Sequence, residues 1–378
     1  MDFHRRLRGL QQAMAESGVN LVAYGPGPDF AYLTGLASTW RSLPAEQRSA
    51  DTVFVPREGT PTVFLTGRDA EASEDTWIAD VRISEDPRED CAIVDEILGD
   101  LGVGSATVPA GAFVAAPVAD ALREAAGAEA RSASGLTGRL RLIKEPQEID
   151  RLRQIARLTD AAMEAVLPSI AKGASQLDIE AELARQGRLL GASGVSFPPA
   201  ARFTKAGSMP SEDPFTHPPD KPLEAGTSIA FDFGFVQDGY CSDFGRSFYC
   251  GPVPPEVRGA YRALHEGLRE TVGGMRAGTR IGDLFGMLEA AVDRCGYGEY
   301  LRARLPNGVL GHSIGLDVHE APWISPAAEG VLEANMVFAL EPKLWDAGEY
   351  YLRVEDMVLV GEERSEFLTG FDRELFEL

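Results

Sequence analysis

Two aspartates separated by a turn form the segment of this chain that points most directly to chemistry. Asp232 and Asp243 stand eleven residues apart in SIAFDFGFVQDGYCSDFGRSF, on either side of Asp238-Gly239. Residues 228–236 and 240–249 are apolar and aromatic, as buried strands are. An Asp-Gly pair between two such runs predicts a β-hairpin.

The register of that hairpin decides whether the two carboxylates meet. A two-residue turn at Asp238-Gly239 places Asp232 opposite Gly245. It places Asp243 opposite Gly234, which makes the two aspartates diagonal neighbours on one sheet face, about 7–8 Å apart between backbones. Two like charges on a buried face need a cation between them. We therefore expect a metal ion here, whereas turn chemistry alone accounts for Asp238.

More acids and histidines follow in apolar sequence. GVLGHSIGLDVHEAP carries His312 and His319, two of the five histidines in the chain. The runs MVFALEP and YLRVEDMVLV, which we expect to be strands, carry Glu341 and Glu355. A lone histidine, or a glutamate paired with Arg353, needs no metal, but this combination of acids and imidazole does. Four carboxylates balance two divalent cations, and such ligands suit Mn²⁺, Fe²⁺, Co²⁺ or Zn²⁺.

The order of these motifs resembles the metallopeptidase family that includes Xaa-Pro aminopeptidase, prolidase and creatinase. The resemblance covers nearly the whole chain, because RLIKEPQEIDRLRQIARLTDAAM (141–163) is similar to the start of the family's catalytic domain and AYLTG (31–35) to its N-terminal domain. It implies an α+β protein. We expect a smaller creatinase/prolidase-like α/β domain over residues 1–138 and a pita-bread catalytic domain with pseudo-two-fold symmetry over 139–378.

The resemblance also implies roles for individual residues. Two divalent metal ions, with Mn²⁺ preferred over Co²⁺, Fe²⁺ or Zn²⁺, would have five ligands: Asp232, Asp243, His312, Glu341 and Glu355. Glu341 would also be the acid–base group. His319 and His217 would contact the substrate and stabilise the oxyanion. Apart from the resemblance, Arg353 lies two residues before Glu355 and so on the same strand face, which predicts that it orients Glu355 and contacts the substrate site.

The chain departs from the family pattern near the expected site. The family's Glu-Pro-Gly is Glu-Pro-Lys343 here, and Ser313 replaces a glycine beside His312. The segment RFTKAGSMPSEDPF (202–215) matches the family poorly. Residues 198–222 are expected to form one long irregular segment, of the kind that often frames an active site. The chemistry is therefore better defined by the sequence than the substrate is.

The resemblance implies cleavage of peptides with proline at the second position. A dipeptidase needs a cation for the substrate's terminal carboxylate. Residues 320–342 contain no Lys or Arg, which favours an aminopeptidase acting on longer peptides, although Lys343, Arg202 or Lys205 could supply the charge. Two other functions stay open: a metal-dependent hydrolase or lyase of a small non-peptide metabolite, and a non-catalytic binding module, against which the complete ligand set counts.

Composition narrows the cellular setting. The 378 residues suffice for two domains, and the net charge of −22 opposes binding to nucleic acid or anionic membranes. The four cysteines have no CxxC spacing, which predicts free thiols in a reducing compartment. The first residues read as an amphipathic helix, and no apolar run is long enough to span a membrane. We expect a cytoplasmic protein and, from the resemblance, a homodimer.

Periodicity predicts the elements that position these residues. Helices are expected at 5–17, 146–170, 254–275 and 281–295, with another after Ser175, which forms an N-terminal cap with Asp178. Strands are expected at VNLVAYG, DTVFVP and TPTVFLTG in the N-terminal half. Two further strands are expected within 336–361.

Overall fold

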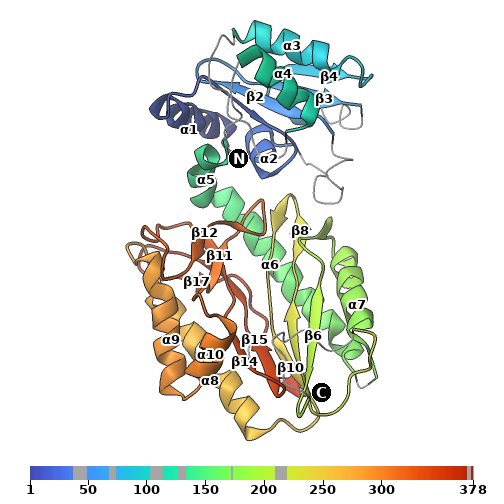
Figure 1. Ribbon diagram of the computed structural model, residues 1–378, viewed down its shortest axis with the longest axis vertical. Helices are drawn as coiled ribbons and strands as arrows, with labels where there is room; N and C mark the ends of the chain where they lie inside the picture. Colours follow the sequence, from blue (N-terminus) through green and yellow to red (C-terminus); the bar gives the residue numbers. More distant parts are fainter. Residues whose placement is uncertain are drawn as a thin grey trace. The chain divides into compact units, whose positions relative to one another are not determined.

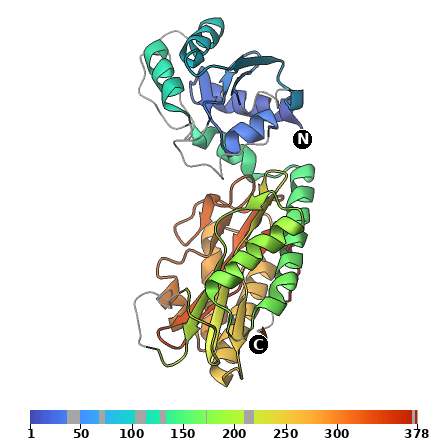
Figure 2. The ribbon, with the colours of Figure 1, turned by 90° about the vertical axis from the view of Figure 1, so that its right-hand side faces the viewer.

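The computed structural model of the chain describes residues 1–36, 49–67, 74–102, 114–126, 133–171, 173–208, 219–372 and 376–377. It divides into two compact units, Met1–Arg141 and Leu142–Leu378, each with its own sheets and helices (Figures 1 and 2).

The N-terminal unit is built on a four-stranded sheet of order β1-β2-β3-β4, antiparallel except for the parallel β3–β4 pair. Its strands are β1 (Leu21–Tyr24), β2 (Thr52–Pro56), β3 (Thr62–Thr66) and β4 (Asp80–Ser84). Its helices are α1 (Phe3–Glu16), α2 (Pro28–Thr34), α3 (Asp90–Asp100), α4 (Ala116–Ala126) and α5 (Ser134–Leu142). The three predicted strands are confirmed. Helix α1 begins earlier than predicted because the Asp2 side chain accepts from the Arg5 backbone N–H (2.9 Å).

The first half of the C-terminal unit places helices α6 (Pro146–Val166) and α7 (Gln176–Leu189) against short strands (Figure 2). The strands are β5 (Gly194–Val195), β6 (Ala200–Lys205), β7 (Thr227–Asp232), β8 (Phe235–Gln237), β9 (Tyr240–Cys241) and β10 (Ser247–Cys250). A 3₁₀ turn at Leu167–Ser169 ends the predicted long helix. The capping box at Ser175 is confirmed, since its hydroxyl accepts from Asp178 N and its backbone N–H donates to the Asp178 carboxylate.

The second half repeats helices beside strands. Its helices are α8 (Pro255–Gly274), α9 (Leu284–Arg294), which follows a 3₁₀ turn at Ile281–Asp283, and α10 (Gly298–Arg304). Its strands are β11 (Gly311–Ser313), β12 (Glu320–Ile324), β13 (Val337–Leu340), β14 (Lys343–Asp346), β15 (Tyr350–Arg353), β16 (Asp356–Leu359) and β17 (Glu366–Phe367). Strand β18 (Phe376–Glu377) joins the sheet β18-β10-β7-β6, while β12-β11-β13-β16-β17 form a second sheet. Separate apolar clusters fill the two halves.

The predicted hairpin has the predicted register. Gln237 pairs with Tyr240, Phe233 with Phe244, and the same alignment continues along β7 and β10. Asp238 (φ 49°) and Gly239 (φ 82°) both adopt positive φ, as a type I′ turn requires. Asp232 and Asp243 are therefore the diagonal neighbours that the sequence predicts.

Two predictions about strands are wrong in detail. The strands expected in MVFALEP and YLRVEDMVLV extend into four short ones, β13 to β16, interrupted at Glu341-Pro342 and at Val354-Glu355. Proline cannot donate to a ladder, which explains the interruption at Glu341-Pro342. Glu355 instead leaves β15 and β16 and pairs with Gly245 in an isolated bridge. The expected irregular segment 198–222 also contains a strand, β6, because Ala201 and Phe203 are buried while β6 pairs with β7 along its whole length.

All four cysteines are free thiols, as predicted, with Cys241 and Cys250 buried and Cys91 and Cys295 exposed. Within the part of the chain that the structure describes, no helix combines the length and apolar character needed to cross a membrane.

Candidate metal centre and active site

Three carboxylates from separate segments of the C-terminal unit converge. Asp232 ends β7, Asp243 lies between β9 and β10, and Glu355 lies between β15 and β16. Each offers an oxygen within 4.8 Å of the other two. The backbone brings the two halves together here, because Glu355 N donates to Gly245 O at 2.8 Å. A close approach of acids from both halves is the arrangement that the sequence predicts.

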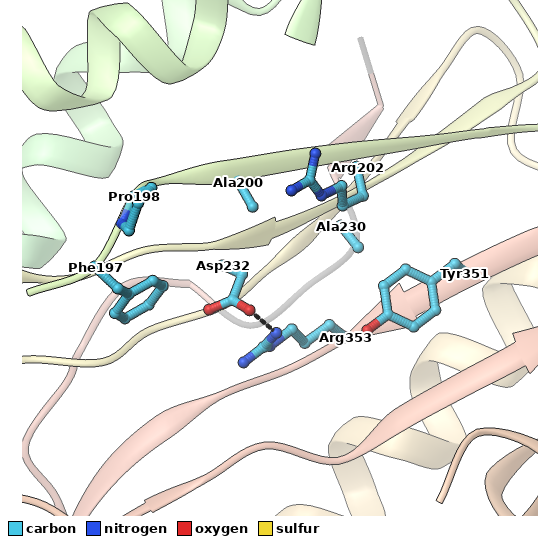
Figure 3. Close-up of a pocket in the computed structure, with 8 residues that line it drawn as sticks. All are labelled: Phe197, Pro198, Ala200, Arg202, Ala230, Asp232, Tyr351 and Arg353. Atoms are coloured by element: carbon cyan, nitrogen blue, oxygen red, sulfur yellow. Dashed lines mark hydrogen bonds and ion pairs between the residues drawn. The ribbon is translucent and has the colours of Figure 1, made fainter. Parts of the chain in front are cut away.

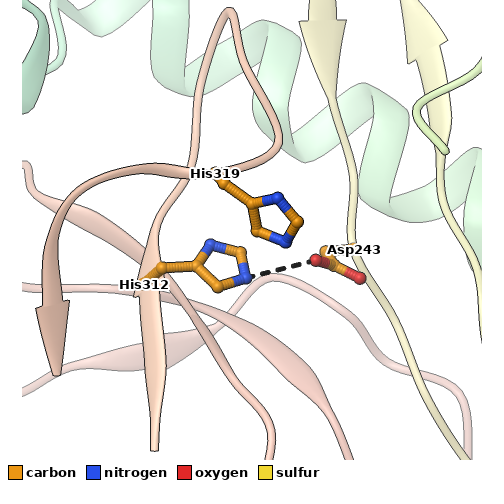
Figure 4. Close-up of side chains that lie close together, drawn as sticks. All are labelled: Asp243, His312 and His319. Carbon is orange, nitrogen blue, oxygen red and sulfur yellow. Dashed lines mark ion pairs between the residues drawn. The ribbon is translucent and has the colours of Figure 1, made fainter. Parts of the chain in front are cut away.

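Two imidazoles complete a second group with Asp243. His312 on β11 places Nε2 3.4 Å from Asp243 Oδ2, and the His319 ring lies 4.5 Å from the His312 ring between centroids (Figure 4). Nδ1 of His312 lies 3.1 Å from the carbonyl oxygen of Ser313. A proton on Nδ1 that is donated to this carbonyl leaves the Nε2 lone pair facing Asp243, which is the tautomer a metal ligand needs.

His319 has an aromatic neighbour that sequence reasoning missed. The indole of Trp323 on β12 stacks on His319 with centroids 5.4 Å apart and planes at 25°, and Trp323 remains 45% exposed. Burial, followed by the nearby His312, lowers the pKa of His319. His319 is therefore a neutral imidazole near pH 7, positioned by stacking and able to donate one hydrogen bond.

Arg353 lies among the carboxylates and contacts three of them. Its Nη1 donates to Asp232, its Nη2 to Glu341 Oε2 at 2.7 Å, and its Nε to Glu355 Oε2 at 2.9 Å. The side chain fits only because position 245 is glycine: a Cβ there would lie 2.9 Å from Cδ and Nε of Arg353. The guanidinium thus orients both expected strand glutamates as well as Asp232.

Glu341 receives a second cation. Lys343 on β14 contacts the same oxygen, Glu341 Oε2, that Arg353 contacts. Although burial raises the pKa of Glu341, Arg353 and Lys343 outweigh it and lower that pKa to about 2. Sequence analysis named Lys343 as a departure from the family's glycine and as a possible cation for a substrate carboxylate, but not as a partner of Glu341. The available signal was the two-residue spacing, which places the Glu341 and Lys343 side chains on the same side of an extended segment.

The donor set fits divalent cations. Asp243 and Glu355 are buried, and among the described residues no donor reaches Asp243 Oδ1 or Glu355 Oε1. Burial, together with nearby carboxylates such as Asp232 beside Asp243, raises the pKa of both groups. Burying a carboxylate oxygen that accepts no hydrogen bond costs free energy unless a cation binds it. Hard oxygen ligands with one imidazole are those that Mn²⁺, Fe²⁺, Co²⁺ and Zn²⁺ accept.

Sequence analysis did not predict a buried ion pair next to these ligands. Arg246 and Asp356 are fully buried and pair at 2.6 Å. Arg246 Nη1 also donates to the carbonyl oxygens of Gly245 (2.7 Å) and Glu355 (2.6 Å). The pair therefore fixes the backbone at the point where the two halves meet. The only sequence signal was that each residue lies close to an expected ligand.

The structure brings together seven of the eight residues that the sequence singled out. They are Asp232, Asp243, His312, His319, Glu341, Arg353 and Glu355. The eighth, His217, lies outside the described residues.

Known proteins share this fold and its two-domain order. The model of metallopeptidase family M24 matches residues 150–362, and that of the creatinase/prolidase N-terminal domain matches residues 6–143. The "Probable dipeptidase PepE" of Mycobacterium bovis is 29% identical over 381 residues, covering 99% of this chain and 96% of that protein.

Two solved structures cover the whole chain. The Xaa-Pro dipeptidase from Bacillus anthracis is 26% identical with a TM-score of 0.85, and each chain covers 100% of the other. The prolidase from Thermococcus sibiricus is 25% identical with a TM-score of 0.86, again at 100% of both chains. The predicted α+β fold, a creatinase-type N-terminal domain followed by a pita-bread catalytic domain, is confirmed. Since the M24 model spans more than half of the sequence and encloses every acid and imidazole of the described site, this protein is a peptidase-class hydrolase that belongs to metallopeptidase family M24.

Proposed function

We propose that this protein is a dinuclear-metal-dependent peptidase that hydrolyses the Xaa-Pro bond of small peptides and releases the N-terminal residue. The observation that carries the proposal is the convergence of Asp232, Asp243 and Glu355, with two buried oxygens that lack donors. The names of its relatives, which include a dipeptidase, an Xaa-Pro dipeptidase and a prolidase, support the substrate class.

Five side chains would hold the two ions: Asp232, Asp243, His312, Glu341 and Glu355. We propose Mn²⁺ as the preferred ion, with Co²⁺, Fe²⁺ or Zn²⁺ as alternatives. Two such ions supply a water of lowered pKa and polarise a carbonyl group. Arg353 aligns the carboxylates of Asp232, Glu341 and Glu355 through its forked donors.

Glu341 would carry the proton between the attacking water and the leaving nitrogen. Its low pKa keeps the carboxylate ionised at working pH, so an acceptor is always available.

His319 would donate a hydrogen bond to the developing oxyanion, and so would His217. A neutral His319 has one N–H to offer, and its stacking on Trp323 limits ring rotation. One such donor contributes about 2.7–4 kcal/mol to transition-state stabilisation.

Mass spectrometry of peptide cleavage tests the proposal. Protein loaded with Mn²⁺ should release alanine from Ala-Pro or Ala-Pro-Ala, and the EDTA-treated protein should not. Absence of cleavage in protein with verified bound metal would remove the Xaa-Pro assignment and leave a non-peptide substrate as the explanation. The homodimer and the cytoplasmic location stay predictions.

A further inference from the structure

The side chains of the candidate site differ in how their backbones are held. Asp232 and Arg353 stand on β7 and β15, whose ladders fix their backbones. Both line a pocket of about 260 Å³ beside the carboxylate cluster, as does Arg202 on β6 (Figure 3). His319 lies in no strand, because it is the last residue of the loop that joins β11 to β12. Contacts other than strand pairing must therefore fix the direction of the His319 imidazole.

The loop closes on the carboxylate of Glu320, the residue that follows His319. Glu320 Oε1 accepts from the backbone N–H of Asp317 at 3.0 Å. Glu320 itself begins β12, opposite Ser313 of β11, and its side chain is 6% exposed. Because this carboxylate binds the middle of the loop from the position next to His319, its location determines the path of the backbone at His319.

Lys144 binds the other oxygen of this carboxylate. Lys144 Nζ donates to Glu320 Oε2 at 3.3 Å, and the Lys144 side chain is 1% exposed. The Lys144 backbone N–H donates to the carbonyl oxygen of Asn335 at 3.0 Å, which fixes the backbone from which the lysine extends. A buried ion pair adds little to stability, because the lost hydration of both charges offsets their attraction. Stability of the fold alone therefore does not explain the Lys144–Glu320 pair.

Gly315 provides the room for this pair. A Cβ at position 315 would lie 3.1 Å from both carboxylate oxygens of Glu320 and from Lys144 Nζ. The carbonyl oxygen of Gly315 accepts from the backbone N–H of Cys241 at 2.8 Å, and Cys241 precedes the proposed ligand Asp243 by two residues. One end of the loop is therefore bonded to the hairpin of the first half, and the other end to Lys144.

We propose that Lys144 is a positioning residue, which acts through Glu320 to hold the loop so that the His319 imidazole faces the metal centre. The kinetic part of this inference rests on the proposed function. The His319 ring lies against His312 and Trp323, with centroids 4.5 and 5.4 Å away. Trp323 stands three residues after Glu320 on β12. Both the imidazole and its stacking partner therefore depend on where Glu320 is held.

Kinetics of the full-length, Mn²⁺-loaded protein test the role of the pair. Lys144→Met should lower kcat for Ala-Pro by about 10- to 100-fold, because a misdirected hydrogen-bond donor loses much of its effect on the transition state. KM should change far less, and metal content should equal that of the wild type, since no proposed ligand is altered. In a His319→Ala background, Lys144→Met should lower kcat no further, because the group through which Lys144 acts is already absent.

A double variant separates positioning from stability. Lys144→Met alone leaves the buried carboxylate of Glu320 unpaired, which should lower Tm. Lys144→Met/Glu320→Gln removes both charges and keeps an acceptor for the Asp317 N–H, so its Tm should return towards the wild-type value. Its kcat should stay low, because methionine cannot hold the side chain at position 320. Recovery of kcat together with Tm would show that the pair serves stability only and would overturn the proposal.

Arg153→Met is the matched control. Arg153 stands on α6, which begins two residues after Lys144, and its guanidinium contacts the Glu366 carboxylate on β17. The change removes a positive charge that also pairs with an acid of the second half. Strands β17 and β12 form opposite edges of one sheet, so this contact is remote from the His319 loop. Arg153→Met should keep the wild-type kcat, KM and metal content.

NMR of the histidine rings gives a readout that does not depend on turnover. The full-length protein, loaded with diamagnetic Zn²⁺, has five histidines, and His319→Ala identifies the signals of His319. Stacking on Trp323 shifts these signals through the ring current of the indole. Lys144→Met should move or broaden them, whereas Arg153→Met should leave them in place.

The outcomes distinguish failure of this inference from failure of the proposed function. Unchanged His319 signals in Lys144→Met, or a loss of kcat that is equally large in the His319→Ala background, would overturn the role of Lys144 and leave the peptidase intact. If the metal-loaded wild-type protein cleaves no Xaa-Pro peptide, the proposed function fails. In that case, His319 signals that change in Lys144→Met and not in Arg153→Met would still support the positioning role.

Discussion

Lys343 and Arg353 stand opposite each other in the β14–β15 ladder, and both contact the same oxygen, Glu341 Oε2. Like charges directly opposite on a sheet destabilise it unless an anion lies between them. The carboxylate of Glu341 is that anion. The cluster thus contains two fixed positive charges before any metal ion binds, and both compete with metal for the same ligand.

Neutralising Lys343 should strengthen metal binding. Lys343→Met keeps the bulk of the side chain but removes its positive charge. Because that charge lies beside Glu341, a proposed metal ligand, it repels a bound cation. The Kd for Mn²⁺ should therefore fall roughly tenfold or more. Calorimetric titration of EDTA-treated protein measures this. Lys343→Arg keeps the charge and should keep the wild-type affinity. An unchanged Kd in Lys343→Met would show that Lys343 swings away when metal binds.

Removing Glu341 should lower turnover severely while leaving the fold intact. In Glu341→Ala both the proton acceptor and one proposed metal ligand are lost, so kcat should fall by about 10²–10⁴-fold or more. Steady-state assays with Ala-Pro, accompanied by circular dichroism, provide the measurement. Glu349→Gln is the control, because Glu349 is exposed in the turn between β14 and β15 and touches no ligand of the site. A near-normal rate in Glu341→Ala would end its assignment as the acid–base group.

Removal of His312 and removal of His319 should have different effects on metal binding and turnover. His312→Ala should lose bound metal, because it deletes the Nε2 that faces Asp243. His319→Ala should keep its metal but lose about 10²–10³-fold in kcat, the effect of one missing oxyanion donor. Elemental analysis beside kinetics separates the two. Equal metal loss in both variants would instead make His319 a ligand.

The metal-free protein should lose stability as pH rises. Burial raises the pKa of Asp243 and Glu355 in the folded state, whereas in the unfolded chain these groups titrate near about 4. Below that pH both states hold the protons. Above it the unfolded chain releases them first, so the free energy of unfolding falls until the raised pKa values are passed. Glu341, with its pKa lowered to about 2, acts oppositely, but only in more acidic solution.

Bound metal should remove this penalty, because it holds Asp243 and Glu355 ionised. The difference in Tm between Mn²⁺-loaded and EDTA-treated protein should therefore widen from about pH 5 to pH 8. Asp243→Asn, which cannot titrate, should flatten the curve of the metal-free protein. Calorimetry in buffers of different ionisation enthalpy should also detect protons released on metal binding. A pH-independent Tm difference with no proton release would contradict the raised pKa values.

Much of the candidate site was predictable because its signals are local. The type I′ turn at Asp238-Gly239 is encoded by two residues, and once it forms, period-two alternation sets the register that makes Asp232 and Asp243 neighbours. The capping box at Ser175 is likewise a matter of three-residue spacing. These features need no knowledge of distant parts of the chain.

What the primary structure alone determined is therefore the set of ligand candidates, the hairpin that pairs two of them, and the acidic, thiol-bearing character of the protein. Tertiary packing decided which cations approach them. Arg246 could bind the carbonyls of Gly245 and Glu355 only after the two halves met. Arg202 became a wall of the pocket only because β6 pairs with β7. Contacts between residues a hundred positions apart depend on how all the strands of the domain pair and how its whole core packs. No short segment of sequence contains that information.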